Sequence, residues 1–231
     1  MLYRLSVSPY RDRVVLKGAM LFSLWAPVPY RATGDLDLLG FGENAPADIA
    51  GVRLDFVAEL AGARLPMHVD IGYGDVITPD PVDIEYPSIL EQPAPHLRAY
   101  PAETVVAEKF QAMVALDMLN SRMKDFFDLW AIAGAFAFEG EVLARAIQTT
   151  FERRETRLPT KTPSALTAGF AEAKEVQWAA FLRRTVIALA PEPFPEIQAR
   201  IAELVMPPMI ATTETAPFNA HWTPGGPWND G

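Results

Sequence analysis

Two aspartates separated by one residue, Asp35 and Asp37, are the side chains in this sequence best suited to chemistry. They lie in an apolar stretch that reads as a β-strand, and alternate residues of a strand point to the same face. Two carboxylates held so close together repel each other unless a cation lies between them. Mg²⁺ prefers oxygen ligands and also binds phosphates. The pair therefore predicts a magnesium site suited to nucleotidyl transfer.

The strand predicted over 31–39 places Arg31 and Thr33 on the same face as the two aspartates. The opposite face is small and apolar, so we expect one face to pack and the other to present its polar groups. Acidic residues are disfavoured in strands, and two on one face indicate a functional role. The alternative is a half-exposed edge strand with its polar residues turned outward.

Asp70 is the candidate third carboxylate. It lies in a predicted strand over 65–72, in which apolar residues alternate with other residues. If this strand pairs beside the Asp35 strand, Asp70 completes a triad, and three carboxylates can hold two Mg²⁺ ions about 3.5–4 Å apart. Asp75 is a rival, but it follows Gly72 and Gly74 and is expected in a turn.

Lys17 and Gly18 mark the end of a predicted strand over 14–17 and the start of a short helix. Backbone N–H groups at a helix N-terminus can cradle a phosphate, and a glycine allows the phosphate to approach closely. Lys17 would add a positive charge there. Because many strand-to-helix turns contain glycine, this signal gains its weight from the aspartates that follow.

A second candidate group lies in the C-terminal half. Lys109 is on a predicted helix over 103–119, and Lys124, Asp125 and Asp128 are on the next one, over 122–138. Spacings of three and four residues make the last three neighbours on one helix face. Asp125 is expected to orient Lys109 or Lys124, or to hold a base or ribose. The alternative is an ordinary amphipathic helix with Phe127 in the core and lysines at the surface.

Composition limits the classes of protein that this chain can be. It has 231 residues, half of them hydrophobic, which predicts a globular protein rather than a disordered one. It has no cysteine, which excludes disulfides and thiolate chemistry, and its three histidines are far apart. The net charge of −9 argues against nonspecific nucleic-acid binding, although basic residues cluster locally over 4–31 and over 145–161, outside the acidic segment 35–103. Without an apolar span or a secretory signal, a cytoplasmic location is expected.

The pattern along the chain predicts an α+β protein, with a small mixed-sheet core followed by a helical domain. Residues 1–96 form the expected nucleotidyltransferase core, 97–206 the helical domain and 207–231 a Pro/Gly-rich tail. Within this scheme, the proline-rich segment 77–101 is expected to be an extended connector with little regular structure.

Five ordered segments of the chain resemble the AbiEii/AbiGii toxin family of nucleotidyltransferases, within the DNA polymerase beta-like superfamily. They are LKGAMLFSLW, RATGDLDLLG, VDIGYGDVITP, YPAETVVAEKFQAMV and NSRMKDFFDLW. The likeness covers most of the chain, and the five segments in their shared order are far more specific than any one of them. The resemblance implies a toxin of a type IV toxin–antitoxin, or abortive-infection, system, with a cognate AbiEi-like transcriptional regulator encoded nearby as its antitoxin.

The resemblance also implies roles for individual residues. Asp35, Asp37 and Asp70 would ligate two Mg²⁺ ions, Lys109 would contact the incoming NTP, and Asp125 resembles an essential aspartate of the family. Lys17, Gly18, Arg31, Thr33, Lys124 and Asp128 are the further residues expected around the nucleotide. Some family members add nucleotides to tRNA 3′ ends, so tRNA is the expected acceptor.

Two alternatives remain open from the sequence. The nucleotide could pass to a protein or to a small, aminoglycoside-like molecule, which the acidic net charge favours mildly. The chain could instead be a catalytically decayed remnant that only binds its antitoxin. Three departures from relatives bear on activity: Ala19 stands where they have glycine or serine, the segment before the first strand is short, and the segment 39–52 is short. The two shortened segments motivate the second alternative.

Overall fold

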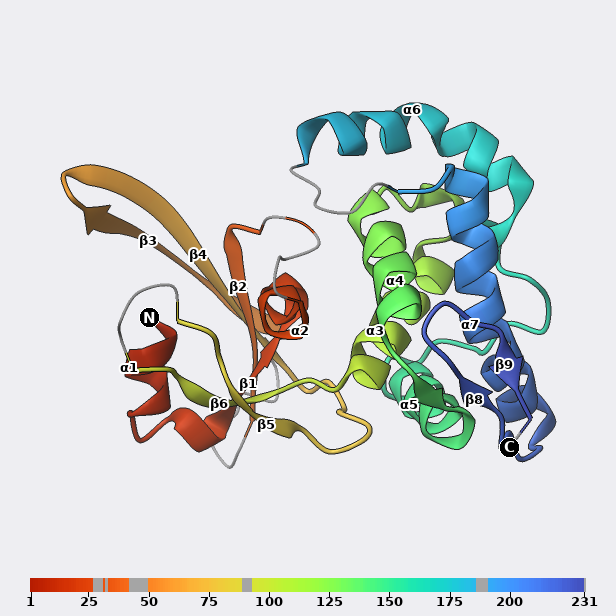
Figure 1. Cartoon of the computed structure of the whole chain (residues 1–231), viewed down its shortest axis with the longest axis horizontal. Helices are drawn as coiled ribbons and strands as arrows, with labels where there is room; N and C mark the ends of the chain where they lie inside the picture. Colours follow the sequence, from red (N-terminus) through yellow and green to blue (C-terminus); the bar gives the residue numbers. More distant parts are fainter. Residues whose placement is uncertain (27–30, 32, 42–49, 89–92, 186–190, 231) are drawn as a thin grey trace. The chain divides into compact units, whose positions relative to one another are not determined.

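The computed structural model describes residues 1–26, 31, 33–41, 50–88, 93–185 and 191–230. The chain forms two compact units. The N-terminal unit comprises Met1–Asp75 and Asp80–Tyr100, and the C-terminal unit comprises Val76–Pro79 and Pro101–Gly231. Figure 1 shows the first unit in red to yellow and the second mainly in green to blue.

A six-stranded mixed sheet organises the N-terminal unit. Its strand order is β3-β4-β2-β1-β6-β5. Strand β2 is parallel to β4 and antiparallel to β1, β1 is parallel to β6, and the pairs β3–β4 and β5–β6 are antiparallel. The strands are β1 (Val14–Lys17), β2 (Asp35–Gly40), β3 (Gly51–Leu60), β4 (Ala63–Tyr73), β5 (Val82–Glu85) and β6 (His96–Ala99).

Short helical segments complete this unit. They are α1 (Leu2–Ser6), the 3-10 turns η1 (Arg11–Arg13) and η2 (Gly18–Leu21), and α2 (Phe22–Trp25). Four apolar side chains of β1, η2 and α2 are almost fully buried, namely Val15, Leu16, Leu21 and Phe22. Their burial holds β1 and the turn after it in place beside β2.

Two expectations about this unit need correction. The strand predicted from residue 31 begins only at Asp35, while Arg31 forms an isolated bridge outside it. The segment 77–101, expected to be a connector, contains the β5–β6 hairpin. Its prolines lie outside the two strands, where they remove no ladder hydrogen bond, so they do not prevent pairing.

Strand β2 confirms the predicted alternation. Asp35 and Asp37 are partly exposed, whereas Leu36 and Leu38 are buried. The β3–β4 hairpin extends past the start of β2. Strand β4 begins at Ala63 but pairs with β2 only from His68 onward. Its tip therefore extends beyond the other strands, as Figure 1 shows.

The C-terminal unit is helical, as expected. Its main helices are α3 (Ala102–Leu116), α4 (Met123–Ala135), α5 (Gly140–Arg153), α6 (Ala168–Arg184) and α7 (Phe194–Glu214), with 3-10 turns η3 (Asp117–Leu119) and η4 (Ser164–Leu166). Aromatic rings from three helices form its core: Phe126 lies 5.5 Å from Phe170 and 5.2 Å from Phe194, and Phe194 stacks on Trp178 at 4.8 Å.

The residues from 207 onward are more ordered than the predicted tail. Helix α7 continues through Pro207 and Pro208 to Glu214. After this helix the chain forms β8 (His221–Trp222) and β9 (Trp228–Asn229). These two strands complete a small three-stranded sheet with β7 (Phe138–Glu139). Buried Trp222 donates its indole N–H to the Ala133 carbonyl at 2.9 Å. This anchor joins the end of the chain to α4.

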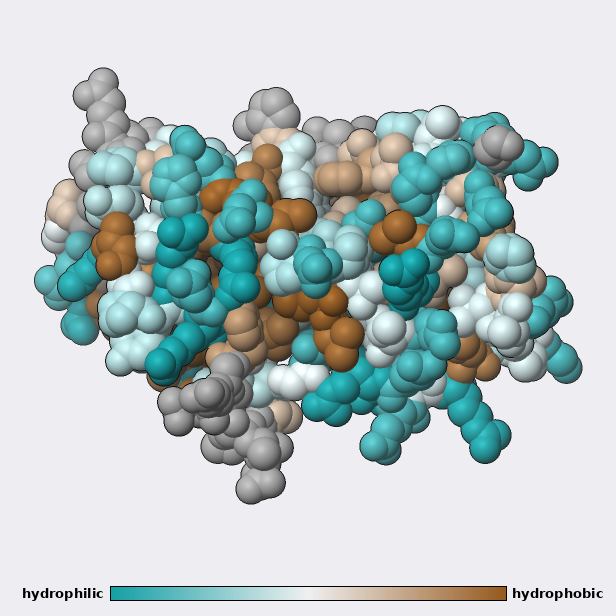
Figure 2. Space-filling model, turned by 90° about the horizontal axis from the view of Figure 1, so that it is seen from below, coloured by the Kyte–Doolittle hydropathy of each residue, from teal (hydrophilic) through white to brown (hydrophobic). Residues whose placement is uncertain are grey.

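The surface is that of a protein whose large apolar groups are mostly buried. Hydrophilic residues and smaller hydrophobic patches intermix on the face drawn in Figure 2. Across the part of the chain that the structure describes, no helix has the length and apolar character needed to cross a membrane.

Candidate active site

Four charged residues form a row across four neighbouring strands. Lys17 of β1 is the register partner of Asp37 on β2, Asp37 is the partner of Asp70 on β4, and Asp70 is the partner of Arg53 on β3. Register partners on adjacent strands point to the same face of a sheet. Two carboxylates therefore lie side by side, with a cation on the strand beyond each. This confirms the predicted pairing of the Asp70 strand beside the Asp35 strand.

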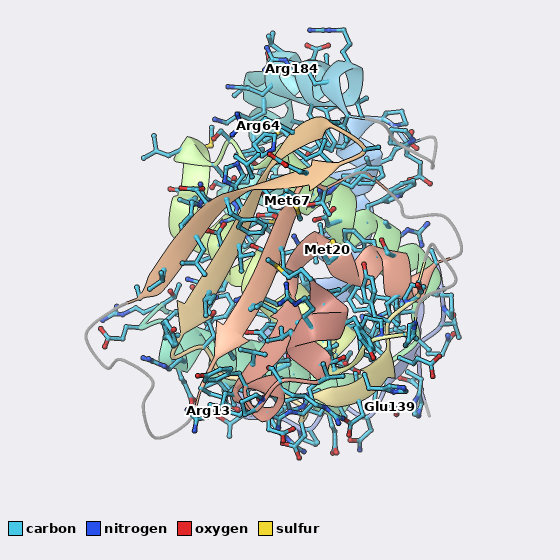
Figure 3. The ribbon with its side chains drawn as sticks, turned by 90° about the vertical axis from the view of Figure 1, so that its left-hand side faces the viewer. Arg13, Met20, Arg64, Met67, Glu139 and Arg184 are labelled. Carbon is cyan, nitrogen blue, oxygen red and sulfur yellow. The ribbon has the colours of Figure 1, made fainter. Side chains whose placement is uncertain are left out.

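A second row crosses the sheet two residues away. Asp35 is the register partner of His68, and His68 is the partner of Asp55 on β3. His68 Nδ1 pairs with an Asp55 carboxylate oxygen. By alternation this row shares its face with Asp37 and Asp70. In Figure 3, where Arg64 and Met67 are labelled near the hairpin tip, the strands that carry both rows run side by side.

Gly18 fits closely against Asp37. It begins the 3-10 turn after β1, and its φ of +74° lies in the left-handed region that glycine adopts readily. A Cβ at this position would lie 2.0 Å from Asp37 Oδ2. The absence of a side chain at Gly18 therefore lets the backbone turn approach the carboxylate.

Lys17 has an acidic partner in the same region. Its Nζ lies 2.8 Å from Asp75 Oδ2, and it also lies 5.0 Å from the centre of the Tyr100 ring. Asp75, the rival for the third carboxylate, is thus occupied with Lys17. Asp70, which lies directly beside Asp37, is better placed for that role.

Arg53 forms two parallel hydrogen bonds with Asp70, the candidate third carboxylate. Its Nε donates to Asp70 Oδ1 and its Nη2 to Asp70 Oδ2, both at 2.7 Å. Bidentate pairs of this kind are the geometrically specific form of the arginine–carboxylate contact. The hydrogen bond to Asp70 and the charge of Asp70 raise the pKa of the Arg53 guanidinium above its ordinary value.

Asp35, Asp37 and Asp70 have the oxygen ligands that suit a hard divalent cation, although their side chains do not meet at one point. Three carboxylates lie on one face of two adjacent strands, and carboxylate oxygens are the ligands that Mg²⁺ prefers. In the described ranges, no three acidic or histidine side chains approach closely enough to hold a metal ion. Both oxygens of Asp70 are engaged by Arg53 instead.

The other residues predicted around this strand are placed differently. Arg31 is 8% exposed, and its guanidinium lies 5.7 Å from the centre of the Phe22 ring. Thr33 Oγ1 accepts a hydrogen bond from the Asp35 backbone N–H at 3.4 Å, just before β2 begins. Arg31 is therefore partly committed to packing, and Thr33 supports the start of the strand.

The candidate residues of the C-terminal unit form a buried charge cluster. Lys109 on α3 donates to Asp125 Oδ1 at 2.7 Å and to Asp128 Oδ2 at 2.8 Å, both on α4. Arg122 Nε lies 2.6 Å from Asp125 Oδ2. The side chains of Lys109, Asp125 and Asp128 are 13%, 1% and 0% exposed. Asp125 therefore contacts Lys109, which is one of the two lysines that it was expected to orient. The other, Lys124, is exposed.

The cluster keeps Lys109 and Asp125 ionised in spite of burial. Burial alone would lower the pKa of Lys109, but the charges of Asp128 and Asp125 outweigh it and raise that pKa. Burial alone would raise the pKa of Asp125, but the charges of Lys109 and Arg122 lower it below its ordinary value. The ion pairs therefore hold α3 and α4 together through neutral pH.

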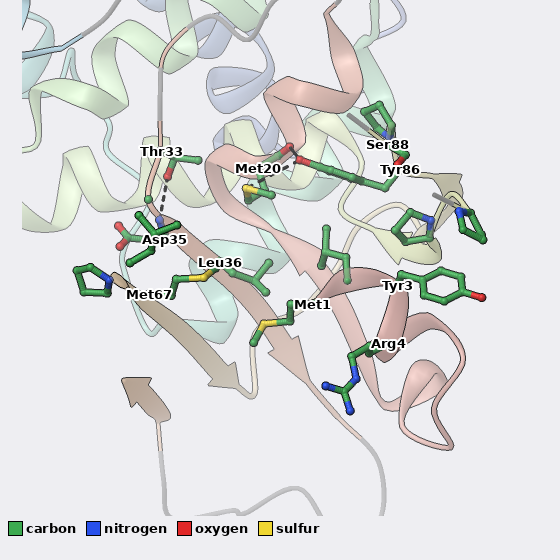
Figure 4. A pocket seen from close by; sticks show the side chains of 17 residues that line it. Met1, Tyr3, Arg4, Met20, Thr33, Asp35, Leu36, Met67, Tyr86 and Ser88 are labelled. Carbon is green, nitrogen blue, oxygen red and sulfur yellow. Dashed lines mark hydrogen bonds between the residues drawn. The ribbon is translucent and has the colours of Figure 1, made fainter. Parts of the chain in front are cut away.

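A cavity of about 740 Å³ opens in the N-terminal unit near the start of β2. Figure 4 shows Met1, Met20, Leu36 and Met67 around it, with Asp35 at its margin. Alternation places Leu36 and Met67 on the sheet face opposite Asp37 and Asp70. The lining is mainly apolar, so it offers little to hold a triphosphate.

Sequence reasoning missed Arg53, Asp55 and His68 as neighbours of the carboxylates. Arg53 and Asp55 show the same one-residue spacing as Asp35 and Asp37, which is the signal that could have found them. The missing information was the register between β3 and β4, which joins residues up to 21 positions apart, such as Gly51 and Gly72.

A mixed sheet with a glycine turn packed against one carboxylate of a closely spaced pair, and a third carboxylate beside them, is an arrangement that suits nucleotidyl transfer. The family model described as "Nucleotidyl transferase AbiEii toxin, Type IV TA system" matches residues 1–50 and 41–200. The chain belongs to this family of toxins. No curated protein matches it.

Proposed function

We propose that the protein is a Mg²⁺-dependent nucleotidyltransferase toxin that transfers a nucleotide from an NTP to an RNA acceptor, the tRNA 3′ end. The observation that carries the proposal is the adjacency of Asp37 and Asp70 on parallel strands, with Asp35 on the same face. Family membership supports nucleotidyl transfer and a cognate antitoxin as partner. The cytoplasm, where NTPs and tRNA occur together, is the proposed site of action.

Asp35, Asp37 and Asp70 are the residues that would hold the metal. A divalent cation bound there would neutralise triphosphate charge and activate the attacking hydroxyl. The sheet positions the carboxylates, because each is fixed by strand pairing rather than by a loop. Gly18 leaves room for Asp37, and Lys17 adds a positive charge beside it.

Lys109 contributes a positioned positive charge. An ammonium group has three N–H donors, and Asp125 and Asp128 accept two of them. We assign the third to a phosphate oxygen of the nucleotide. Lys124 is exposed on the same helix as the two aspartates and adds a positive charge there.

An RNA acceptor fits the local distribution of positive charge better than the net charge suggests. Exposed basic residues gather on and after α5, namely Arg145, Arg153, Arg157 and Lys161. Phosphate contacts from such residues supply most nonspecific affinity for nucleic acid.

A labelling assay tests the proposal. The protein is incubated with Mg²⁺, each α-labelled NTP in turn, and bulk tRNA. The test variant is D35N/D37N, and the matched control is D83N, because the Asp83 side chain is 80% exposed at the surface of the same unit. We expect label on tRNA with the native protein and D83N, its loss by at least about a hundredfold in D35N/D37N, and its loss on chelation.

The other outcomes separate the alternatives. Metal-dependent NTP binding without label on RNA would refute the RNA acceptor and direct the search to protein or small-molecule acceptors. Neither NTP binding nor label would refute catalysis and favour a remnant that only binds its antitoxin. Equal labelling by D35N/D37N and the native protein would refute the assignment of the site.

A further inference from the structure

The contact between Arg53 and Asp70 differs from the pair that Lys17 forms with Asp75. Lys17 is paired with Asp75, which lies outside the carboxylate triad. Arg53 instead engages a member of the triad, and it occupies both oxygens at once. In such a bidentate pair, each carboxylate oxygen accepts a hydrogen bond from the guanidinium, so the lone pairs that face the arginine are already occupied.

Exposure shows that this contact can open. The Arg53 side chain is 60% exposed and the Asp70 side chain 32% exposed. Exposed ion pairs contribute little net stability, because water solvates both partners well when they separate. The cluster around Lys109, whose aspartates are fully enclosed, is the opposite case.

Strand geometry keeps the two partners within reach of each other. Arg53 and Asp70 are register partners on the antiparallel β3–β4 pair, so their backbones are fixed a short distance apart. The arginine side chain can therefore leave and return without rearranging the sheet. Because Asp37 is the partner of Asp70 on the other side, Arg53 and a metal ion approach the same carboxylate from opposite strands.

We propose that Arg53 is a built-in competitor for the third carboxylate, so that the free protein binds one divalent cation through Asp35 and Asp37, and a second cation binds only when it displaces Arg53 from Asp70. This inference rests on the proposed metal-dependent function. It assigns Arg53 as a positioning residue that sets the order in which the two ions bind. Once displaced, its guanidinium is free to meet a phosphate group.

The test counts bound metal and needs no turnover. Mn²⁺ titrations followed by electron paramagnetic resonance give the number of ions and their dissociation constants for native protein, R53Q, R53K and R64Q. Arg64 is the matched control because it is an exposed arginine on β4, on the same sheet face as Asp70. Melting curves confirm that each variant is folded.

We expect R53Q to tighten binding of the second ion by at least about fivefold, the lower end of typical coupling between sites, with the first ion unchanged. R53K keeps the charge but loses the fork, so its second-ion affinity should lie between those of R53Q and the native protein. R64Q should match the native protein. In the native protein, diamagnetic Mg²⁺ at saturation should also shift the NMR signal of the Arg53 Nε–H, which donates to Asp70.

Two results would overturn the inference while leaving the proposed function intact. One is a second ion that binds R53Q and the native protein with equal affinity. The other is weaker second-ion binding in R53Q, which would make Arg53 a supporting contact rather than a competitor. Absence of any Mn²⁺ binding, even to the native protein, would instead refute the metal-dependent function together with the inference.

Discussion

Replacing Lys109 by methionine should destabilise the C-terminal unit severely. The substitution keeps the length and apolar stem of the side chain but removes the ammonium group that Asp125 and Asp128 share. Asp128 is fully enclosed and Asp125 nearly so, and Arg122 is paired with Asp125. Removing one partner of a buried ion pair costs about 3–5 kcal/mol, because a charge remains without compensation.

That loss is large enough to measure by thermal unfolding. For chains of 150–250 residues, about 1 kcal/mol changes the melting temperature by roughly 2–4 °C, so K109M should melt about 6–20 °C below the native protein. K124M is the matched control, because Lys124 lies on the adjoining helix with its side chain exposed. Surface substitutions of this kind change stability by only about 0.5 kcal/mol or less.

The pH dependence of the loss identifies its cause. In the native protein, the lowered pKa of Asp125 contributes stability above the unfolded value near 3.9, and this contribution is lost as pH falls through the folded value. The raised pKa of Lys109 contributes stability that is lost only as pH rises through its folded value, above about 10.4. In K109M the buried carboxylates should instead take up protons readily, which stabilises the variant as pH falls.

The difference between K109M and the native protein should therefore shrink from pH 7 toward pH 4. A triple variant, K109M/D125N/D128N, should recover part of the loss at pH 7, because neutral amides cost less to bury than unpaired carboxylates. A K109M protein that melts within about 2 °C of K124M, or a loss that does not change with pH, would refute the reasoning.

Two further predictions follow from single side chains. G18A should lose Mn²⁺ affinity and about 1–3 kcal/mol of stability, because an alanine Cβ would displace Asp37 and the positive φ at position 18 is strained for alanine. The control G62A has a φ of +83° and open space around it, so it should keep the metal affinity. Equal metal binding by both variants would contradict this prediction. W222F should unfold at lower urea concentration, by about 1–3 kcal/mol, because it loses the indole hydrogen bond to Ala133; an unchanged midpoint would show that the C-terminal sheet does not anchor α4.

The sequence predicted the parts of the candidate site that local pattern determines. Alternation along β2 placed Asp35 and Asp37 on one face and Leu36 on the other, and burial confirms it. The spacing along α4 placed Asp125 and Asp128 on one face, and both contact Lys109. In each case the period of a single element was sufficient.

What the sequence could not predict depends on register and packing between distant segments. Pro207 and Pro208 are strong local signals against a helix, yet α7 continues through them while it packs against α4 and α5. Tertiary packing outweighs local propensity there. The Arg53 contact likewise depends on which residue of β3 faces Asp70, and a shift of one position would have turned Arg53 to the other face.

The protein thus uses acidic and basic pairs in two different ways, and burial decides between them. Around Lys109, water cannot replace a lost partner, so the pairs are permanent and hold α3 to α4. Around Arg53, water can replace it, so the pair can be exchanged for a more highly charged cation. A nucleotidyltransferase whose third carboxylate is held this way would keep its metal site incomplete until both cation and substrate are present. The Mn²⁺ titration of R53Q measures that difference directly, because removal of an exchangeable pair should tighten binding of the second ion, whereas removal of a supporting contact should weaken it.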